Sequence, residues 1–328
     1  MDKPRHPAYL RAAPLLAVSS IAALPTVALV AANDSYWLTG RRAALITLQL
    51  VLLQLGFGIV LGMGLAFWNL ANGLPSNTGT NHPLALMLSN GSAYALVIWR
   101  ECRRSRCTLV VPATPQFSPA LLLAPMSLLV AGAAIGLSDL ENVTHALAPQ
   151  PEWLRHYFGQ LTSMAAHPYF ALFFVAVFAP ITEEILFRGL LLRGLLVTST
   201  PVRAIAISSL LFAAMHLNPW QIPVALVYGG LLGWVYLRTR SLTLCIFGHG
   251  LNNLGSLLSP GLPFTIPGFN GEHAPGVALF QPWWFDALGL IFLVGGAFLF
   301  HRLAPPAVAP ARAGEPPLLT DQPAANTN

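Results

Sequence analysis

Residues 173–192 read FFVAVFAPITEEILFRGLLL. An apolar run of about 20 residues is long enough to cross the hydrocarbon core of a bilayer as one helix. The two glutamates in its middle are costly there, because an ionisable side chain loses its hydration in hydrocarbon. The stretch therefore predicts a membrane helix and, within it, a group that is kept for function.

The composition of the whole chain agrees with a membrane protein. The 328 residues are 55% hydrophobic and 9% charged, with a mean hydropathy of +0.62, whereas a soluble globular chain carries about 25% charged residues. We therefore predict an all-α fold, a polytopic transmembrane helical bundle in a single membrane domain. The net charge of +5 does not indicate a nucleic-acid partner, since the arginines lie in short clusters between apolar runs, as topology signals do.

About nine apolar segments follow one another, so we expect eight or nine membrane helices. They cover residues 12–32, 43–69, 84–99, 117–137, 168–192, 202–217, 221–237, 242–258 and 284–301. The third, sixth, seventh and eighth are short, which suits helices inside a bundle. The alternative for the first is a signal peptide with a small-residue cleavage site at Val30 and Ala32, but its apolar run is long for a signal.

The arginines predict how the bundle is oriented. If nine helices alternate, the arginine clusters all fall on one side, which we expect to be cytoplasmic. These clusters are Arg41 and Arg42, Arg100 to Arg106, Arg193 and Arg203, Arg238 and Arg240, and Arg302. Lys3, Arg5 and Arg11 would then be outside, and we expect the later charges to dominate. Cys102 and Cys107 lie in the sequence RECRRSRC, so we expect both thiols to be reduced.

Few ionisable residues lie inside the apolar segments. Of the twelve acidic residues only Glu183 and Glu184 lie well inside a segment, and of the nine histidines all but His216 and His249 lie in loops or at segment margins. Glu184 and Arg188 are four residues apart, so they share a helix face and can form an ion pair. Glu183 lies about 100° from Glu184 around the helix axis, so its side chain can face the interior of the bundle.

Two further pairs keep the four-residue spacing. Phe212 with His216, and His249 with Asn253, each project from one face of a helix. Counted from the arginine-bearing ends at about 1.5 Å per residue, Glu183, His216 and His249 lie roughly 10–20 Å deep. These three side chains can therefore meet near one level of the bilayer.

These residue types are sufficient for hydrolysis. A carboxylate in a low-dielectric pocket can act as a general base toward water, and a histidine can share the proton. A histidine with an asparagine on the next turn can donate hydrogen bonds to a developing oxyanion. The alternative is a zinc ion bound by Glu183, His216 and His249, with an open position for water, although the chain has no HExxH motif.

The order of the motifs resembles that of a known family. The motifs are, in order, Glu183-Glu184-x-x-x-Arg188, Phe212-x-x-x-His216 and His249-x-x-x-Asn253. They are similar to the EExxxR, FxxxH and HxxxN pattern of the CAAX prenyl endopeptidase and bacteriocin-processing family of intramembrane proteases. Each motif alone is weak, whereas all three in order on successive membrane segments are a specific signal.

The resemblance also implies a division of the chain. Residues 166–258 would form the protease core. Residues 1–165 would be N-terminal transmembrane helices of unassigned role, and residues 259–303 a loop and the final membrane helix. The Pro- and Ala-rich residues 304–328 are predicted to be a disordered tail.

The resemblance implies a role for each catalytic residue. Glu183 would activate the water with His216, while His249 and Asn253 would stabilise the oxyanion. Glu184 would position these residues without contacting the substrate.

Arg188 and Phe212 would be supporting residues in the same resemblance. The family has been described both as metal-dependent and as glutamate-dependent. Asparagine is a poor zinc ligand and suits an oxyanion hole better, so we favour a glutamate-type hydrolase with no cofactor. Zinc remains the alternative, and the protein would then be a metalloprotease.

Other functions compete with an intramembrane endopeptidase. A proton-coupled transporter also uses buried carboxylates and histidines, but it predicts paired repeats with broken helices, which the sequence does not show. A non-catalytic scaffold or immunity factor would be expected to have lost Glu183, His216 or His249. The expected partners are the lipid bilayer and a membrane-anchored protein or peptide substrate. That substrate is a CAAX-type protein or a bacterial anchor or leader peptide, and we expect the bacterial cytoplasmic membrane as the location.

Overall fold

The computed structural model describes residues 36–75, 83–105, 119–154, 168–271 and 277–304. Within these ranges every regular element is helical and none is a strand, which confirms the predicted all-α bundle. The α-helices are α2 (Gly40–Ala71), α3 (Pro83–Ser105), α4 (Leu123–Leu147), α6 (Pro168–Phe173), α7 (Ala179–Glu184), α8 (Arg193–Thr198), α9 (Pro201–Met215), α10 (Ile222–Thr239), α11 (Leu242–Leu258) and α12 (Trp283–Leu303). The shorter elements are the 3₁₀ turns η1 (Pro119–Leu122) and η4 (Ser259–Gly261), and the π-helical η2 (Phe174–Phe178) and η3 (Ile185–Leu192).

Each predicted apolar segment from residue 43 onward coincides with a helix. The first segment, residues 12–32, lies outside the described residues, as do Lys3, Arg5, Arg11 and Cys107. Five helical stretches are long and apolar enough to cross a membrane, and the shorter α9 is apolar too. The five are Gly40–Ala71, Ala120–Leu147, Pro168–Thr198, Ile222–Thr239 and Trp283–Leu303. The chain is therefore an integral, multi-pass membrane protein.

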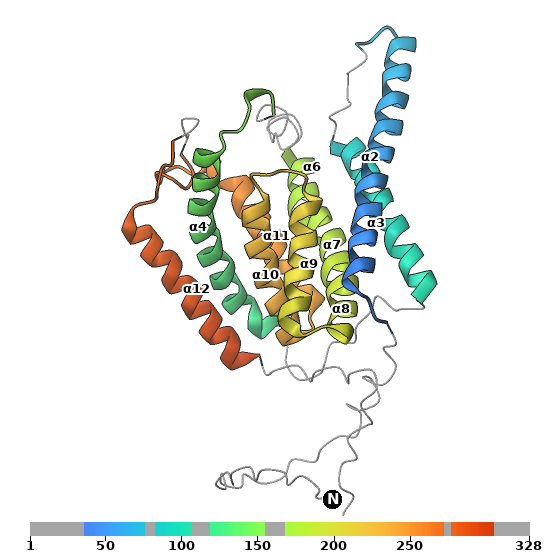
Figure 1. Cartoon of the computed structure of the whole chain (residues 1–328). Coiled ribbons are helices and arrows are strands. Elements are labelled where there is room, and N and C mark those ends of the chain that lie inside the picture. The colour runs from blue at the N-terminus through green and yellow to red at the C-terminus, as the bar shows by residue number, and fades with distance from the viewer. Residues whose placement is uncertain (1–35, 76–82, 106–118, 155–167, 272–276, 305–328) are drawn as a thin grey trace, which may run out of the picture.

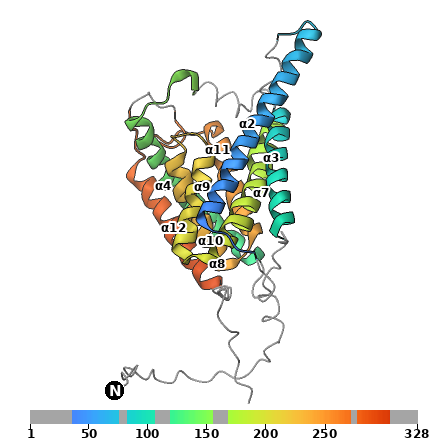
Figure 2. The same ribbon diagram turned by 45° about the vertical axis from the view of Figure 1, so that its right-hand side comes forward.

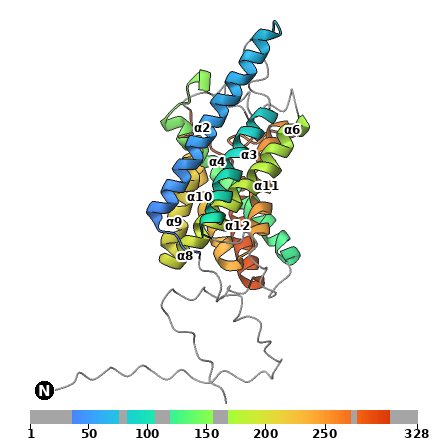
Figure 3. The ribbon, with the colours of Figure 1, turned by 90° about the vertical axis from the view of Figure 1, so that its right-hand side faces the viewer.

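The helices form a layered bundle (Figure 1). Helices α4 and α12 pair on one side, α2 and α3 pair on the other, and α6 to α11 lie between them. The α4–α12 pair is close because of its glycines: a Cβ added to Gly132 would lie 2.3 Å from the backbone nitrogen of Leu293. The far end of α2 projects beyond the other helices (Figures 2 and 3) and exposes apolar side chains such as Val60 and Phe67.

Successive helices alternate in direction, so the arginine-bearing ends meet at one end of the bundle. There the guanidinium of Arg42 donates to Glu101 at 2.8 Å, joining the start of α2 to the end of α3. At the same end, Arg238 of α10 donates to the carbonyl oxygen of Ala304, after α12, at 3.0 Å. The predicted alternation is therefore present in the described helices.

The helix from Pro168 to Thr198 is continuous but irregular. Two π-helical segments, η2 and η3, flank the short α7 that carries the glutamates. Pro180 explains the first one. Proline has no amide hydrogen for the carbonyl four residues earlier, and its ring crowds that carbonyl. This carbonyl belongs to Ala176, inside η2. π-Helical bulges occur often at functional sites.

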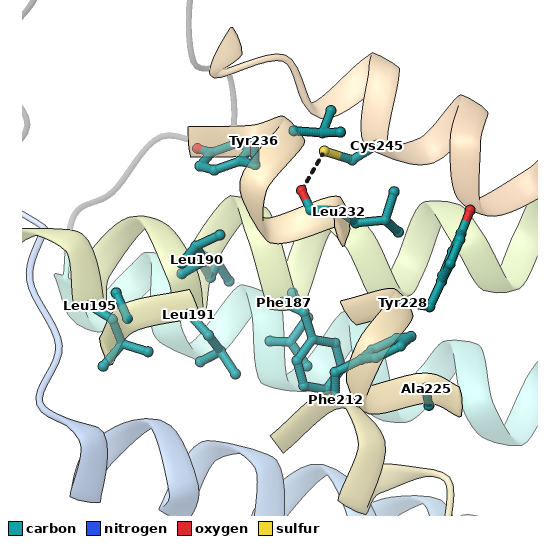
Figure 4. Close-up of a cluster of buried hydrophobic side chains, with 14 of the residues drawn as sticks. Phe187, Leu190, Leu191, Leu195, Phe212, Ala225, Tyr228, Leu232, Tyr236 and Cys245 are labelled. Carbon is teal, nitrogen blue, oxygen red and sulfur yellow. Dashed lines mark hydrogen bonds between the residues drawn. The ribbon is translucent and has the colours of Figure 1, made fainter. Parts of the chain in front are cut away.

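The helix from Pro168 to Thr198 packs against a dense apolar core (Figure 4). The ring of Phe187 from η3 packs edge-on against Phe212 from α9, with 5.3 Å between ring centroids. Tyr228 of α10 lies beside this pair, and the thiol of Cys245 donates to the carbonyl oxygen of Leu232 at 3.6 Å. The core holds the helices that carry the three motifs in a fixed register.

Candidate active site

Glu184 and Arg188 form a buried ion pair, as their spacing predicts. Nη1 of Arg188 lies 2.6 Å from Oε1 of Glu184, and neither side chain is more than 1% exposed. Nη2 of the same arginine donates to the carbonyl oxygen of Gly229 at 3.1 Å, and its guanidinium lies 4.7 Å from the centre of the Phe212 ring. Oε2 of Glu184 and Nε of Arg188 are buried without a hydrogen-bond partner among the described residues. The contacts of Arg188 with Gly229 and Phe212 hold η3 against α10 and α9.

His249 joins the two glutamates. Its Nδ1 lies 2.8 Å from Oε1 of Glu184, and its Nε2 lies 3.8 Å from Oε2 of Glu183. A carboxylate can only accept, so Nδ1 is the donor in the short contact. The contact orients the imidazole and presents Nε2 to Glu183.

Glu183 and Glu184 differ in their surroundings although they are neighbours in the chain. The Glu183 side chain is 14% exposed, whereas that of Glu184 is fully buried. Within the described part of the chain, Glu183 has no hydrogen-bond partner, and its nearest cation-forming group is His249. Glu184 is therefore held in place, and Glu183 is the carboxylate that is open to a water or a substrate.

His216 reaches this group through an aromatic ring. The Phe212 ring packs edge-on against His216, with 4.9 Å between centroids, and against His249, with 5.7 Å. Nδ1 of His216 lies 2.9 Å from the carbonyl oxygen of Phe212, at the C-terminal cap of α9. Among the described residues, no hydrogen bond or ion pair joins His216 directly to Glu183. Both histidines therefore contact the ring of Phe212.

Asn253 lies one turn after His249 and contacts the irregular part of the glutamate-bearing helix. Its Nδ2 donates to the carbonyl oxygen of Val175 in η2 at 2.9 Å. An amide group has two hydrogens, so one remains for an oxyanion. This hydrogen bond also links α11 to η2, the π-helical segment that ends just before Pro180.

The zinc alternative requires Glu183, His216 and His249 to converge on one point. Within the ranges that the structure describes, no three His, Cys, Asp or Glu side chains are grouped closely enough to hold a metal. Glu183, His216 and His249 are not grouped in this way.

Two tyrosines at the site were not predicted from the sequence. Tyr228 packs edge-on against His249, with 6.3 Å between centroids, and its hydroxyl donates to the carbonyl oxygen of Gly248 at 2.8 Å. Tyr94 of α3 is buried, and its hydroxyl donates to the sulfur of Met215. A tyrosine in an apolar segment usually serves packing, so no sequence signal separates these two from core residues.

The polytopic helical bundle thus holds a cluster of carboxylates and imidazoles within it. Residues 165–255 match the family described as type II CAAX prenyl endopeptidase Rce1-like. The match confirms the resemblance drawn from the motifs, and it spans the helices that carry all three. At the level of the family it supports an intramembrane CAAX-type endopeptidase. No curated protein and no solved structure gives a match.

Proposed function

We propose that the protein is a glutamate-type intramembrane endopeptidase that cleaves a protein substrate near its membrane-associated end. One observation carries the proposal: Glu184 is locked by Arg188 and His249, while its neighbour Glu183 is left open beside Nε2 of the same histidine. Environments that separate two adjacent carboxylates commonly assign them different roles. Glu183 is the reactive one, and Glu184 positions the imidazole.

The chemistry needs only these groups and a water. Two atoms 3.8 Å apart, such as Oε2 of Glu183 and Nε2 of His249, can both be within hydrogen-bond distance of one oxygen placed beside them. Glu183 removes a proton from that water as its oxygen bonds to the scissile carbonyl carbon. When the tetrahedral intermediate collapses, the carbon–nitrogen bond breaks and the proton passes from Glu183 to the leaving amine.

The remaining polar groups are proposed to stabilise the intermediate. With both ring nitrogens protonated, His249 would donate from Nε2 to the oxyanion together with the second amide hydrogen of Asn253. His216 would assist Glu183 with the water, as the family pattern implies. The Phe212 ring, which contacts both histidines, would hold their separation constant. A preorganised donor aimed at an oxyanion accounts for about 2.7–4 kcal/mol of barrier lowering.

The substrate class follows from where the site lies. Glu183 is near the middle of a membrane-crossing helix, so the scissile bond must enter the membrane. A lipid-anchored C-terminus, as in a CAAX-type protein, meets this condition, and so does a bacterial anchor or leader peptide. We propose a CAAX-type protein or a bacterial anchor or leader peptide as the substrate, and the cytoplasmic membrane of a bacterium as the location.

Purified protein in vesicles tests the proposal. Farnesylated CAAX peptides and apolar anchor peptides, each with a fluorophore and a quencher, would be offered to the parent and to Glu183→Gln. We expect the parent to cleave one of the two classes and Glu183→Gln to cleave neither. Absence of cleavage of both classes by the parent would favour a non-catalytic scaffold.

A further inference from the structure

A buried hydroxyl beside the site comes from outside the region that matches the family. Tyr94 lies on α3, and its side chain is 3% exposed. Its hydroxyl donates to Sδ of Met215 at 3.4 Å, and Met215 directly precedes His216. Tyr94 is also close enough to Glu183 and Glu184 for their charges to act on it. The phenol therefore lies between α3, α7 and the end of α9 that bears a catalytic histidine.

Gly91 of α3 lies where this helix meets the glutamate-bearing helix. A Cβ added to Gly91 would lie 2.8 Å from Cζ of Phe178, so the lack of a side chain at Gly91 leaves room for the Phe178 ring of the glutamate-bearing helix against α3. From this contact both helices run toward the arginine-bearing end of the bundle. Tyr94 follows Gly91 by about 4.5 Å along the axis, and Glu183 follows Phe178 by about 7.5 Å, at 1.5 Å per residue. The two side chains are thus at similar depths.

The present partner of the hydroxyl is a poor one. Buried tyrosine hydroxyls usually find a good acceptor, whereas a thioether sulfur is a weak acceptor. The other donors at the site are partly committed, because His249 donates through Nδ1 to Glu184 and Asn253 donates one hydrogen to Val175. An anionic oxygen forming nearby would be a far stronger acceptor for the phenol, since charge-assisted hydrogen bonds are about twice as strong as neutral ones.

We propose that Tyr94 is a further catalytic residue, a donor from α3 to the oxyanion of the tetrahedral intermediate. The inference rests on the proposed endopeptidase function and adds to it a residue from the N-terminal helices. At neutral pH a phenol is a neutral donor, so it contributes no base. It exchanges the sulfur of Met215 for the oxyanion, and this gain arises in the transition state rather than on substrate binding.

The test compares Tyr94→Phe with two other variants. Tyr94→Phe keeps the ring and removes the hydroxyl, and we expect kcat to fall about 100-fold, as for loss of one oxyanion donor, with KM within about threefold. Met215→Leu removes the sulfur acceptor and should lose far less, because the sulfur only holds the hydroxyl between turnovers. Tyr236→Phe removes another buried phenol, which lies across the core from Phe212 (Figure 4), and should keep the parent kcat.

A binding measurement separates catalysis from folding. The affinity for a phosphonate peptide, which mimics the tetrahedral intermediate, should fall with Tyr94→Phe in parallel with kcat/KM. The affinity of Glu183→Gln for the uncleaved peptide should be the same with and without Tyr94→Phe. An unchanged kcat for Tyr94→Phe, or equal losses for Tyr94→Phe and Met215→Leu, would overturn the role of Tyr94 alone. An inactive parent would overturn the endopeptidase function as well.

Discussion

Oε1 of Glu184 lies 2.8 Å from Nδ1 of His249, so a fully buried carboxylate orients an imidazole that comes from a helix 65 positions further along the chain. The same oxygen also accepts from Arg188 at 2.6 Å. These two contacts and its full burial hold Glu184 in place. We therefore expect Glu183 to carry out the proton transfer.

Glu183→Gln should abolish activity without destabilising the bundle. The amide cannot remove a proton from water, and loss of a general base costs about 10²- to 10⁴-fold in rate. The side chain has no hydrogen-bond partner among the described residues to lose. Cleavage assays and thermal unfolding in detergent check both points. Parent-like activity of Glu183→Gln would contradict the assignment.

Glu184→Ala should instead destabilise the protein. It leaves Arg188 buried without its carboxylate, and breaking a buried ion pair by removing one partner costs about 3–5 kcal/mol. Replacing both charges, in Glu184→Ala with Arg188→Met, should recover much of this stability. Chemical denaturation of the three proteins would measure it. If the single and double variants unfold at the same denaturant concentration, the ion pair does not hold the bundle together.

The order and approximate ends of the helices could be predicted from the sequence, because apolar runs of bilayer length admit few alternatives. The four-residue spacing also predicted the Glu184–Arg188 pair, since it depends on one helix only. The alternating placement of the arginines followed from the number of segments. All of these are local or additive properties of the chain.

Contacts between helices were less accessible to prediction. The resemblance pairs His249 with Asn253 at an oxyanion. The sequence alone does not show that His249 contacts Glu184, because this contact depends on how α11 is rotated against α7. Tyr94 has no sequence signal, because a tyrosine in an apolar helix has the same pattern whether it packs or donates. The π-helical segment before Pro180 has a local cause, the proline itself. The hydrogen bond from Asn253 to Val175 in that segment depends instead on where α11 lies.

Activity should survive removal of metal ions. Among the described residues, Glu183, His216 and His249 are not grouped closely enough to hold a metal ion. Metal content of the purified protein, and cleavage rates before and after chelation, test this prediction. Stoichiometric zinc whose removal stops cleavage and whose return restores it would show that the residues rearrange around a metal.

The arginine-rich end of the bundle should face the cytoplasm. Cys102 lies at this end of α3 and is partly exposed, whereas Cys245 is fully buried and serves as an internal control. With Cys107 changed to serine, a membrane-impermeant maleimide added to intact cells should label neither thiol. After permeabilisation it should label Cys102 only. Rapid labelling of Cys102 in intact cells would reverse the orientation.

Gly250→Ala should disturb the site although alanine is the better helix former. A Cβ at this position would lie 2.6 Å from the carbonyl oxygen of Ala176, four residues before Pro180. The backbone of η2 cannot move aside as the end of a flexible side chain can. Helix α11 would therefore have to move away from η2. His249 precedes the contact and Asn253 follows it within one turn, so we expect a loss of about tenfold or more in rate and about 1–3 kcal/mol in stability.

Gly255→Ala is the matched control for that change. It lies on the same helix, and a Cβ there would meet nothing within 4 Å. Replacing a glycine in the interior of a helix by alanine stabilises by roughly 0.5–1 kcal/mol, so this variant should be at least as stable as the parent and equally active. Unfolding temperature and cleavage rate of the two variants, measured side by side, separate the contact from helix propensity. If both variants behave alike, the approach of α11 to Ala176 does not position the histidine and the asparagine.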